Sequence, residues 1–186
     1  AFEKDEIDYI YHVAAYKHVN LSEVNPLTYF NNNIFAAEKA QELAILKNSK
    51  FVLVSTDKAV EPTNIMGKSK RLSEILVLAN ARQSNVFEKT AIVRFGNVLN
   101  SSGSVIPIFN NQIEEGGPVT VTDKKATRFF MSISEATALI VNSAKIRSKK
   151  GIFVLDMGAP INIHTLACNL IEQSGFGITY DEPQNG

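Results

Sequence analysis

The chain has 186 residues, of which 45% are apolar and 20% charged, and its 19 basic residues balance its 19 acidic ones. This composition supports a buried core and argues against disorder. The charge balance argues against a general affinity for nucleic acid, and no apolar run reaches the ~20 residues of a membrane span. The one cysteine, Cys168, excludes an internal disulfide.

Short apolar runs alternate along the chain with longer segments of helical composition. In chain order we expect a strand at 9–15, a helix from Pro26 to about Lys47, a strand at 51–55, a helix at 65–80, a strand at 90–95, a helix at 105–115, a strand at 118–122, a helix capped by Ser134 and reaching about Arg147, a strand at 152–155 and a helix at 163–175. The helix at 65–80 carries Leu72, Ile75, Leu76 and Ala79 on one face. Strands joined by helices predict an α/β protein with a mostly parallel sheet.

Ligands of such sheets bind beyond the carboxyl ends of the strands, so the loops at 12–21, 55–64 and 96–104 are the places to look for chemistry. The densest polar cluster is Ser55-Thr56-Asp57-Lys58, directly after a buried strand. An adjacent carboxylate and amine can act as an acid–base pair when their pKa values are moved toward neutrality. A surface ion pair at the start of a loop is the alternative, and both interpretations stay open.

Met66 and Lys70 stand four residues apart, so they share one face of the helix that follows this loop. Taken alone, the pair also fits a methionine packed under the loop beside a solvated lysine.

The stretch from Ser55 to Arg71 resembles the active-site segment of UDP-N-acetylglucosamine 4,6-dehydratases, within the extended short-chain dehydrogenase/reductases. Met66 occupies the place of the usual catalytic tyrosine of that superfamily. Further motifs resemble the family in its own order and extend the likeness over roughly residues 8 to 175: 12–19, 25–27, 33–37, 94–99, 103–107, 127–131 and 135–136. At Ala36-Ala37 the family usually has Gly-Thr.

The resemblance implies NAD or NADP as cofactor and UDP-N-acetylglucosamine or a similar UDP-sugar as substrate. The cofactor-binding residues that it implies are His12, Ala14, Ala15, Asn33, Ser55, Lys70, Phe95 and Gly96. The substrate-binding residues that it implies are Lys17, His18, Asn97 and Arg128. It implies no metal ligand. Structural roles for Asn33 and His18, and a surface charge at Arg128, stay open as alternatives.

The implied reaction moves a hydride from sugar C4 to the cofactor, eliminates water across C5 and C6, and returns the hydride to C6. The catalytic residues that the resemblance implies are Thr56, Asp57, Lys58, Met66 and Lys70. Lys58 is the candidate base for C5, Asp57 the candidate acid for the C6 hydroxyl, and Thr56 the partner of the C4 hydroxyl. Because a thioether cannot take a proton, the C4 proton has to pass through Thr56, a water or Lys70.

All ten glycines lie at Gly67 or later, whereas family members bind the cofactor pyrophosphate with an early glycine-rich turn. We therefore expect an internal fragment of a longer enzyme, with a short relative that lost cofactor binding as the alternative. Residues 1–100 are expected to form the C-terminal part of a Rossmann-like parallel sheet without the N-terminal glycine-rich βαβ unit. Residues 101–186 are expected to form most of a smaller α/β substrate lobe, with some interleaving.

We expect the isolated chain to be inactive and its parent to be a homo-oligomer in the cytoplasm, with or without an inner-membrane anchor. Two rival functions stay open. One is a nucleotide-sugar 4-epimerase or reductase of the same superfamily, and the other is a non-catalytic module that binds sugar nucleotides. Asp57 and Lys58 favour the dehydratase, because neither rival needs an acid and a base for elimination.

Overall fold

A computed structural model of the chain describes residues 6–99, 101, 103–146 and 151–180. The chain divides into two compact units. The first comprises Ala1–Gly96 with Ser134–Asp156, and the second comprises Asn97–Ile133 with Met157–Gly186.

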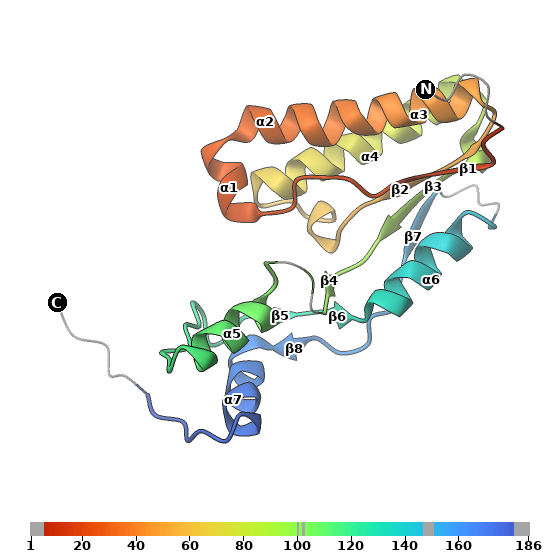
Figure 1. Cartoon of the computed structure of the whole chain (residues 1–186). Helices are drawn as coiled ribbons and strands as arrows, with labels where there is room; N and C mark the ends of the chain where they lie inside the picture. The colour runs from red at the N-terminus through yellow and green to blue at the C-terminus, as the bar shows by residue number, and fades with distance from the viewer. Residues whose placement is uncertain (1–5, 100, 102, 147–150, 181–186) are drawn as a thin grey trace. The chain divides into compact units, whose positions relative to one another are not determined.

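The first unit is built on a four-stranded parallel sheet (Figure 1). Its strands are β1 (Tyr9–His12), β2 (Lys50–Val54), β3 (Thr90–Arg94) and β7 (Ile152–Val154), in the order β1-β2-β3-β7. The register places Leu53 between His12 on β1 and Ile92 on β3. The predicted α/β fold with a parallel sheet is confirmed, and β1 is shorter than predicted.

The helix predicted from Pro26 is present, but it consists of three segments. α2 (Pro26–Phe30) leads into a π-helical turn (Asn31–Phe35) and then into α3 (Ala36–Leu46). A short helix before it, α1 (Val19–Val24), was not predicted. α4 (Ile65–Gln83) begins where predicted and runs three residues further, and the Asn64 side chain caps it by accepting from Gly67 N at 2.8 Å.

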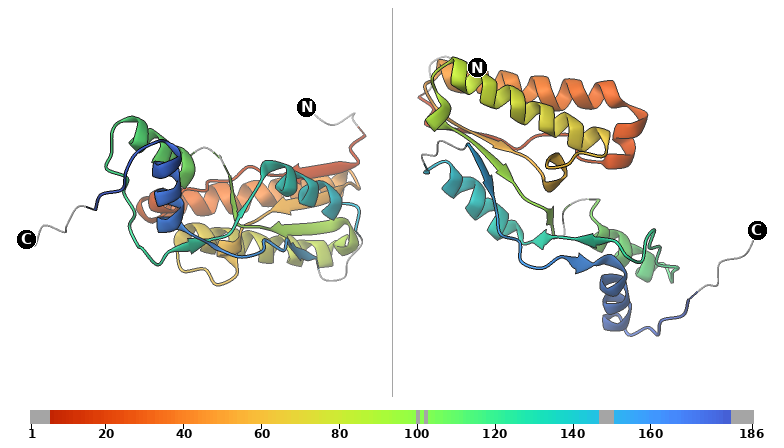
Figure 2. Two further views of the ribbon diagram at one scale, coloured as in Figure 1. Left: turned by 90° about the horizontal axis from the view of Figure 1, so that it is seen from below. Right: turned by 180° about the vertical axis from the view of Figure 1, so that it is seen from behind.

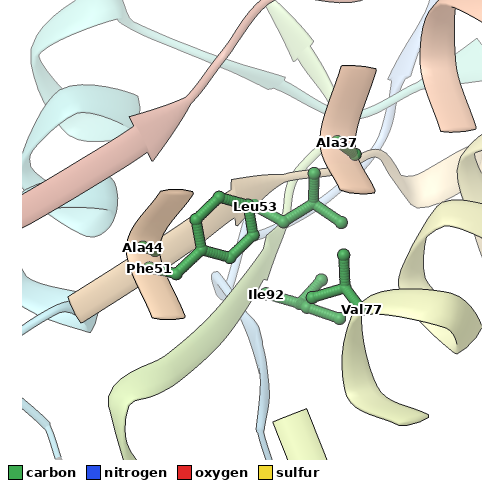
Figure 3. Packing of buried hydrophobic residues seen from close by; sticks show 6 residues of the cluster. All are labelled: Ala37, Ala44, Phe51, Leu53, Val77 and Ile92. Carbon is green, nitrogen blue, oxygen red and sulfur yellow. The ribbon is translucent and has the colours of Figure 1, made fainter. Parts of the chain in front are cut away.

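Helices cover both faces of this sheet, with α3 and α4 on one face and α6 (Ile133–Ser143) on the other (Figure 2). Because strand side chains alternate, Leu53 faces α3 and α4 while Val52 faces α6. On the face covered by α3 and α4, a hydrophobic cluster joins both helices to the sheet. Its buried residues are Ala37, Ala44, Phe51, Leu53, Val77 and Ile92 (Figure 3). Burial of each large side chain here contributes roughly 1.5–3 kcal/mol.

The inward face of α4 is polar for much of its length. Ser69, Lys70, Ser73 and Glu74 are all buried, whereas Leu72 and Ile75 on the other side are 46% and 49% exposed. The apolar face noted in the sequence is therefore not the face that packs on the sheet. The buried polar groups form hydrogen bonds with distant parts of the chain: Ser69 and Glu74 accept them and Ser73 donates one, which makes their burial tolerable.

In its described residues, the second unit holds two small two-stranded sheets and two helices. β4 (Asn97–Val98) pairs in parallel with β6 (Phe130–Met131), and β5 (Thr127–Arg128) pairs antiparallel with β8 (Ile161–Asn162). The helices are α5 (Val105–Glu114) and α7 (Ile163–Gln173), both within two residues of the predicted bounds.

Two predictions at the borders of these elements are wrong. No strand forms at 118–122, where Thr120 N instead donates to the Gln112 side chain at 3.1 Å. Ser134 does not precede α6 as predicted, because the helix already begins at Ile133. The predicted end at Arg147 lies outside the described residues. Among the helices of the described ranges, none combines the length and apolarity that a membrane crossing requires.

Candidate active site

The polar segment after β2 is held in place by the neighbouring strand. Ser55 N donates to Val93 O at 2.7 Å, and Asp57 N donates to Phe95 O at 3.0 Å. Asp57–Ala59 then forms a single 3-10 turn, capped by Thr56, whose Oγ1 accepts from Lys58 N at 3.3 Å. This backbone pairing fixes the starting point of the turn at the carboxyl end of the sheet.

Asp57 and Lys58 form an ion pair on this turn, with 3.0 Å between Lys58 Nζ and Asp57 Oδ1. The Thr56 hydroxyl donates to the same carboxylate oxygen at 2.9 Å. The two charged side chains are 27% and 26% exposed, so the pair is neither buried in the core nor freely solvated. Three of the predicted catalytic side chains therefore form one contiguous cluster.

The N-terminal turn of α4 packs tightly beneath this cluster. Met66 is buried, and its backbone N–H donates to Ser22 Oγ on α1 at 3.2 Å. A Cβ added at Gly67 would lie 2.5 Å from the Lys58 carbonyl oxygen, closer than van der Waals contact allows. Glycine at this position thus permits the approach of α4 to the Asp57–Lys58 turn.

Lys70 is buried rather than solvated, and its ammonium donates to Val54 O at 2.7 Å. Burial lowers the pKa of Lys70 to about 8, against the opposing attraction of Glu74. A lysine with this pKa holds a proton that can be lost or gained near neutral pH.

Asn33 lies in the π-helical turn and is fully buried. Its side chain accepts from Tyr16 N at 2.8 Å and donates to Tyr16 O at 3.1 Å and to Ser69 Oγ at 3.0 Å. Its carbonyl accepts from Ser73 Oγ at 2.8 Å. Asn33 therefore joins the loop after β1 to the inward face of α4, and it is not one of a solvated run of asparagines.

His12 ends β1, and its Nε2 is buried with no hydrogen-bond partner in the part of the chain that the structure describes. Burial, and secondarily the charge of Lys70, lower the pKa of His12. Ala14, Lys17 and His18 lie on the exposed side of the loop that follows, and Ala15 is half-buried. The His18 carbonyl accepts from the Tyr29 hydroxyl at 2.6 Å.

The remaining predicted residues lie further along the chain. Phe95 and Gly96 follow β3 in the first unit and are half-buried. Asn97 and Arg128 belong to the second unit. Asn97 N donates to Phe129 O at 2.9 Å, and the exposed Arg128 guanidinium donates to Thr127 O at 2.7 Å.

Sequence reasoning overlooked the charged residues around Glu74, which is fully buried on α4. Its carboxylate accepts from Arg94, Arg71 and the Ser55 hydroxyl. The one available signal was its spacing of four residues from Lys70, which places both on one helix face. Among the described residues, no group of three His, Cys, Asp or Glu side chains could hold a metal ion.

A parallel sheet with helices on both faces and a polar, partly buried cluster at the carboxyl ends of its strands is a Rossmann-like α/β fold. The solved structure of DesIV, a dTDP-glucose 4,6-dehydratase from Streptomyces venezuelae with NAD bound, shares this fold. The TM-score is 0.82 at 20% identity, over 91% of this chain and 58% of that one. The structure of Pen from Bacillus thuringiensis matches with a TM-score of 0.82 at 40% identity, over 91% and 54% of the two chains.

Residues 1–185 match the family described as "Polysaccharide biosynthesis protein", and the chain belongs to that family. It is 48% identical over 175 residues to the Bacillus subtilis protein named "Probable polysaccharide biosynthesis protein EpsC", covering 94% of this chain and 29% of that protein. It is 42% identical over 150 residues to a Rickettsia canadensis protein named "UDP-glucose 4-epimerase", covering 80% and 44%. The chain thus spans less than half the length of either relative.

Proposed function

We propose that the full-length protein is an NAD(P)-dependent 4,6-dehydratase that acts on UDP-N-acetylglucosamine in polysaccharide or glycan biosynthesis. The observation that carries this proposal is the Asp57–Lys58 ion pair beside Thr56 at the end of β2. Elimination of water across C5 and C6 needs a base and an acid on neighbouring carbons, and this pair offers both. Membership of the polysaccharide biosynthesis family supports the cellular role.

The residues near the strand ends fit a dinucleotide cofactor. The buried Lys70 ammonium and His12 Nε2, which has no hydrogen-bond partner among the described residues, offer polar atoms for ribose hydroxyls in a water-poor setting. Ala14, Ala15, Phe95 and Gly96 are proposed to lie along the cofactor, while Ser55 and Asn33 hold the backbone around it. When bound, NAD(P)⁺ would supply the hydride-transfer chemistry that C4 and C6 of the sugar require.

The ion pair can supply both protonation states that the elimination requires. Transfer of one proton from Lys58 to Asp57 converts two ions into a neutral amine and a neutral acid without changing the net charge. A bound sugar would cover the half-exposed pair, and the removal of water disfavours the ionic form. Neutral Lys58 then takes the C5 proton, and Asp57 protonates the departing C6 hydroxyl.

Proton transfer at C4 has to avoid Met66, since a thioether is no base. Thr56 is proposed to hydrogen-bond the C4 hydroxyl, because its own hydroxyl already reaches the catalytic carboxylate. The proton then leaves through Thr56, a water or Lys70. Of these, Lys70 has a pKa of about 8, which suits reversible proton transfer near neutral pH.

Substrate recognition is proposed to involve the loop after β1 and the second unit. Lys17 and His18 are exposed and would face the sugar. Asn97 and Arg128 would bind the diphosphate, for which the exposed guanidinium of Arg128 offers a planar fork of donors.

A UDP-sugar 4-epimerase is the second candidate, because the Rickettsia relative has that name. An epimerase has no use for an acid and a base that remove water, so the Asp57–Lys58 pair favours the dehydratase. A nucleotide-sugar reductase or a non-catalytic binding module is weaker still on the same ground.

We further propose that the protein is a homo-oligomer whose catalytic part lies in the cytoplasm. The exposed apolar side chains of α4, Leu72 and Ile75, support self-association. The single Cys168 is free, which fits a reducing compartment.

The deciding experiment incubates the full-length protein and NAD⁺ with UDP-N-acetylglucosamine and follows the sugar nucleotide by mass spectrometry. A product lighter by one water supports the dehydratase. A product of unchanged mass with an inverted C4 supports the epimerase, and unchanged substrate contradicts both. In the same assay, Lys58→Ala tests the proposed base. Lys68→Ala is its matched control, since Lys68 is an exposed lysine on α4.

A further inference from the structure

The Glu74 carboxylate is the centre of a buried hydrogen-bond network at the strand ends. Its Oε1 accepts from the Ser55 hydroxyl at 2.6 Å and from Arg94 Nε at 2.8 Å. Its Oε2 accepts from Arg94 Nη2 at 2.5 Å and from Arg71 Nη1 at 3.0 Å. The side chain of Glu74 is fully buried, and that of Arg94 is 12% exposed. A buried carboxylate with this many partners is fixed in position.

Two side chains of α4 hold the last residue of β2 and the residue that follows it. Lys70 donates to the carbonyl of Val54, and Glu74 accepts from the hydroxyl of Ser55. Lys70 and Glu74 are one helical turn apart, so they lie side by side on the inward face. The position of the Lys70 ammonium therefore depends on where the Val54–Ser55 segment sits, and Glu74 is what holds that segment to the helix.

The same carboxylate links this segment to β3. Arg94 is the last residue of β3 and precedes Phe95, whose carbonyl accepts from Asp57 N. The network thus joins the end of β2, which leads into the turn with the ion pair, to β3 and to the helix that carries Lys70.

We propose that Glu74 is a positioning residue for Lys70, acting through the end of β2 and through its own negative charge one turn away. The proposed role of Lys70 in cofactor binding and proton transfer rests on the proposed function, whereas the hydrogen-bond network around Glu74 does not. Glu74 touches no reacting atom in this account, and its effect is transmitted by Ser55, Val54 and the field at Lys70.

The charges around Lys70 predict the direction in which its pKa should change when Glu74 is replaced. His12 lies on β1, the Asp57–Lys58 pair lies on the turn after β2, and Arg94 and Arg71 contact Glu74. Glu74 attracts the Lys70 proton and opposes the effect of burial on the Lys70 pKa. Removal of its charge leaves the ammonium with positive neighbours, and Lys70 should then lose its proton at lower pH.

Two substitutions separate charge from position. Glu74→Gln keeps the size and an acceptor for Ser55 but removes the charge, whereas Glu74→Asp keeps the charge and draws it back by one methylene. The control is Glu42→Gln, because Glu42 is an exposed glutamate on α3 that pairs with Lys39. The full-length protein is used, with its lysines labelled with ¹³C, and Lys70 is assigned through Lys70→Arg.

Two quantities are measured: the Lys70 titration by NMR and the NAD⁺ affinity by calorimetry across pH. We expect Glu74→Gln to move the Lys70 titration to lower pH, with the pH dependence of NAD⁺ affinity moving alongside it. We expect Glu74→Asp to titrate closer to the parent yet to bind NAD⁺ about tenfold more weakly, since small displacements of positioning groups are costly. Glu42→Gln should change neither.

The proposal is overturned if folded Glu74→Gln titrates at Lys70 like the parent, or if Glu74→Asp binds NAD⁺ as tightly as the parent. Should Glu74→Gln not fold, because Arg94 is left buried opposite a neutral amide, Glu74→Asp decides alone. Neither readout requires turnover. Loss of the dehydratase assignment by mass spectrometry, with the Lys70 titration behaving as described, would therefore remove the proposed reaction and leave the role of Glu74 standing.

Discussion

The middle of the central strands and their carboxyl ends differ sharply within a few residues. Phe51, Leu53 and Ile92 are buried among alanine and valine side chains of the covering helices. Directly after them, Ser55 and Arg94 bond a buried carboxylate, and Asp57 bonds Lys58. The same two strands thus pass from apolar packing to hydrogen bonding and charge.

The difference shows how stability and chemistry are divided in this unit. The apolar middle gains free energy from burial and fixes the backbone. Lys70 on α4 contacts the polar end of β2 through the carbonyl of Val54. Its burial works against its charge and therefore costs stability. Groups that are expensive to bury and yet held by several partners mark the part of the sheet that we assign to function.

The largest effect on stability should come from the middle of the sheet. Leu53→Ala removes a fully buried side chain from the cluster formed with α3 and α4. We expect a loss of about 3 kcal/mol in the free energy of unfolding, measured by urea denaturation. Leu72→Ala is the matched control, because Leu72 is 46% exposed. An equal loss in both variants would break the distinction between the sheet core and the outer face of α4.

Gly67→Ala tests how closely the helix supports the polar end. A methyl group there would lie 2.5 Å from the Lys58 carbonyl oxygen, so the turn that carries Asp57 has to shift. We expect turnover to fall about tenfold or more with a smaller loss of stability. Gly177→Ala should leave both unchanged, because the added methyl has no atom of the described residues within 4 Å apart from its own residue and its chain neighbours. Unaltered turnover in Gly67→Ala would show that the position of Lys58 is not critical.

The smallest change in the free energy of unfolding is expected for Lys70→Met, and it is a gain in stability rather than a loss. The folded pKa of Lys70 is about 8 and its ordinary value is 10.5, so the unfolded chain binds more protons between these values. Stability of the parent therefore rises with pH across this window. The variant should be more stable by about 1 kcal/mol at pH 7, despite losing the bond to Val54. This advantage should shrink and then reverse toward pH 10.5, because the pKa shift of Lys70 is worth about 3 kcal/mol across the window.

Urea denaturation of both proteins at pH 7 and near pH 10 measures this gap, and NAD⁺ affinity should fall in the variant. A variant that is less stable at pH 7, or whose advantage grows with pH, contradicts the assignment of Lys70 as a residue buried at a cost.

The strands could be predicted because a short run such as Phe51–Val54 is apolar on both faces, as a sheet covered on both sides requires. The loop containing Asp57 and Lys58 followed from the same rule, since ligands of parallel sheets bind at the carboxyl ends. Roles within the loop came from the family resemblance and not from the spacing.

The inward face of α4 could not be predicted from local pattern. Its apolar residues Leu72 and Ile75 point away from the sheet, while Ser73 bonds Asn33, 40 positions earlier. Two of the groups that make the burial of Glu74 tolerable are also distant in sequence: Arg94 lies 20 positions later and Ser55 lies 19 positions earlier. A local sequence pattern does not include partners that lie 20 or 40 positions away. The short α1 was not predicted because its N-terminus has no side-chain cap, and a capping residue is the local signal by which a helix start is recognised in a sequence.

The central claim is that Lys58, at the polar end of β2, removes the C5 proton. The most direct test runs the reaction of the full-length protein in D₂O and follows deuterium at C5, with Lys68→Ala as the control and Met66→Tyr as a second active-site variant. We expect Lys58→Ala to abolish incorporation at C5, Lys68→Ala to retain it in full and Met66→Tyr to retain some turnover. Deuterium that still enters C5 in Lys58→Ala would contradict the assignment of the base.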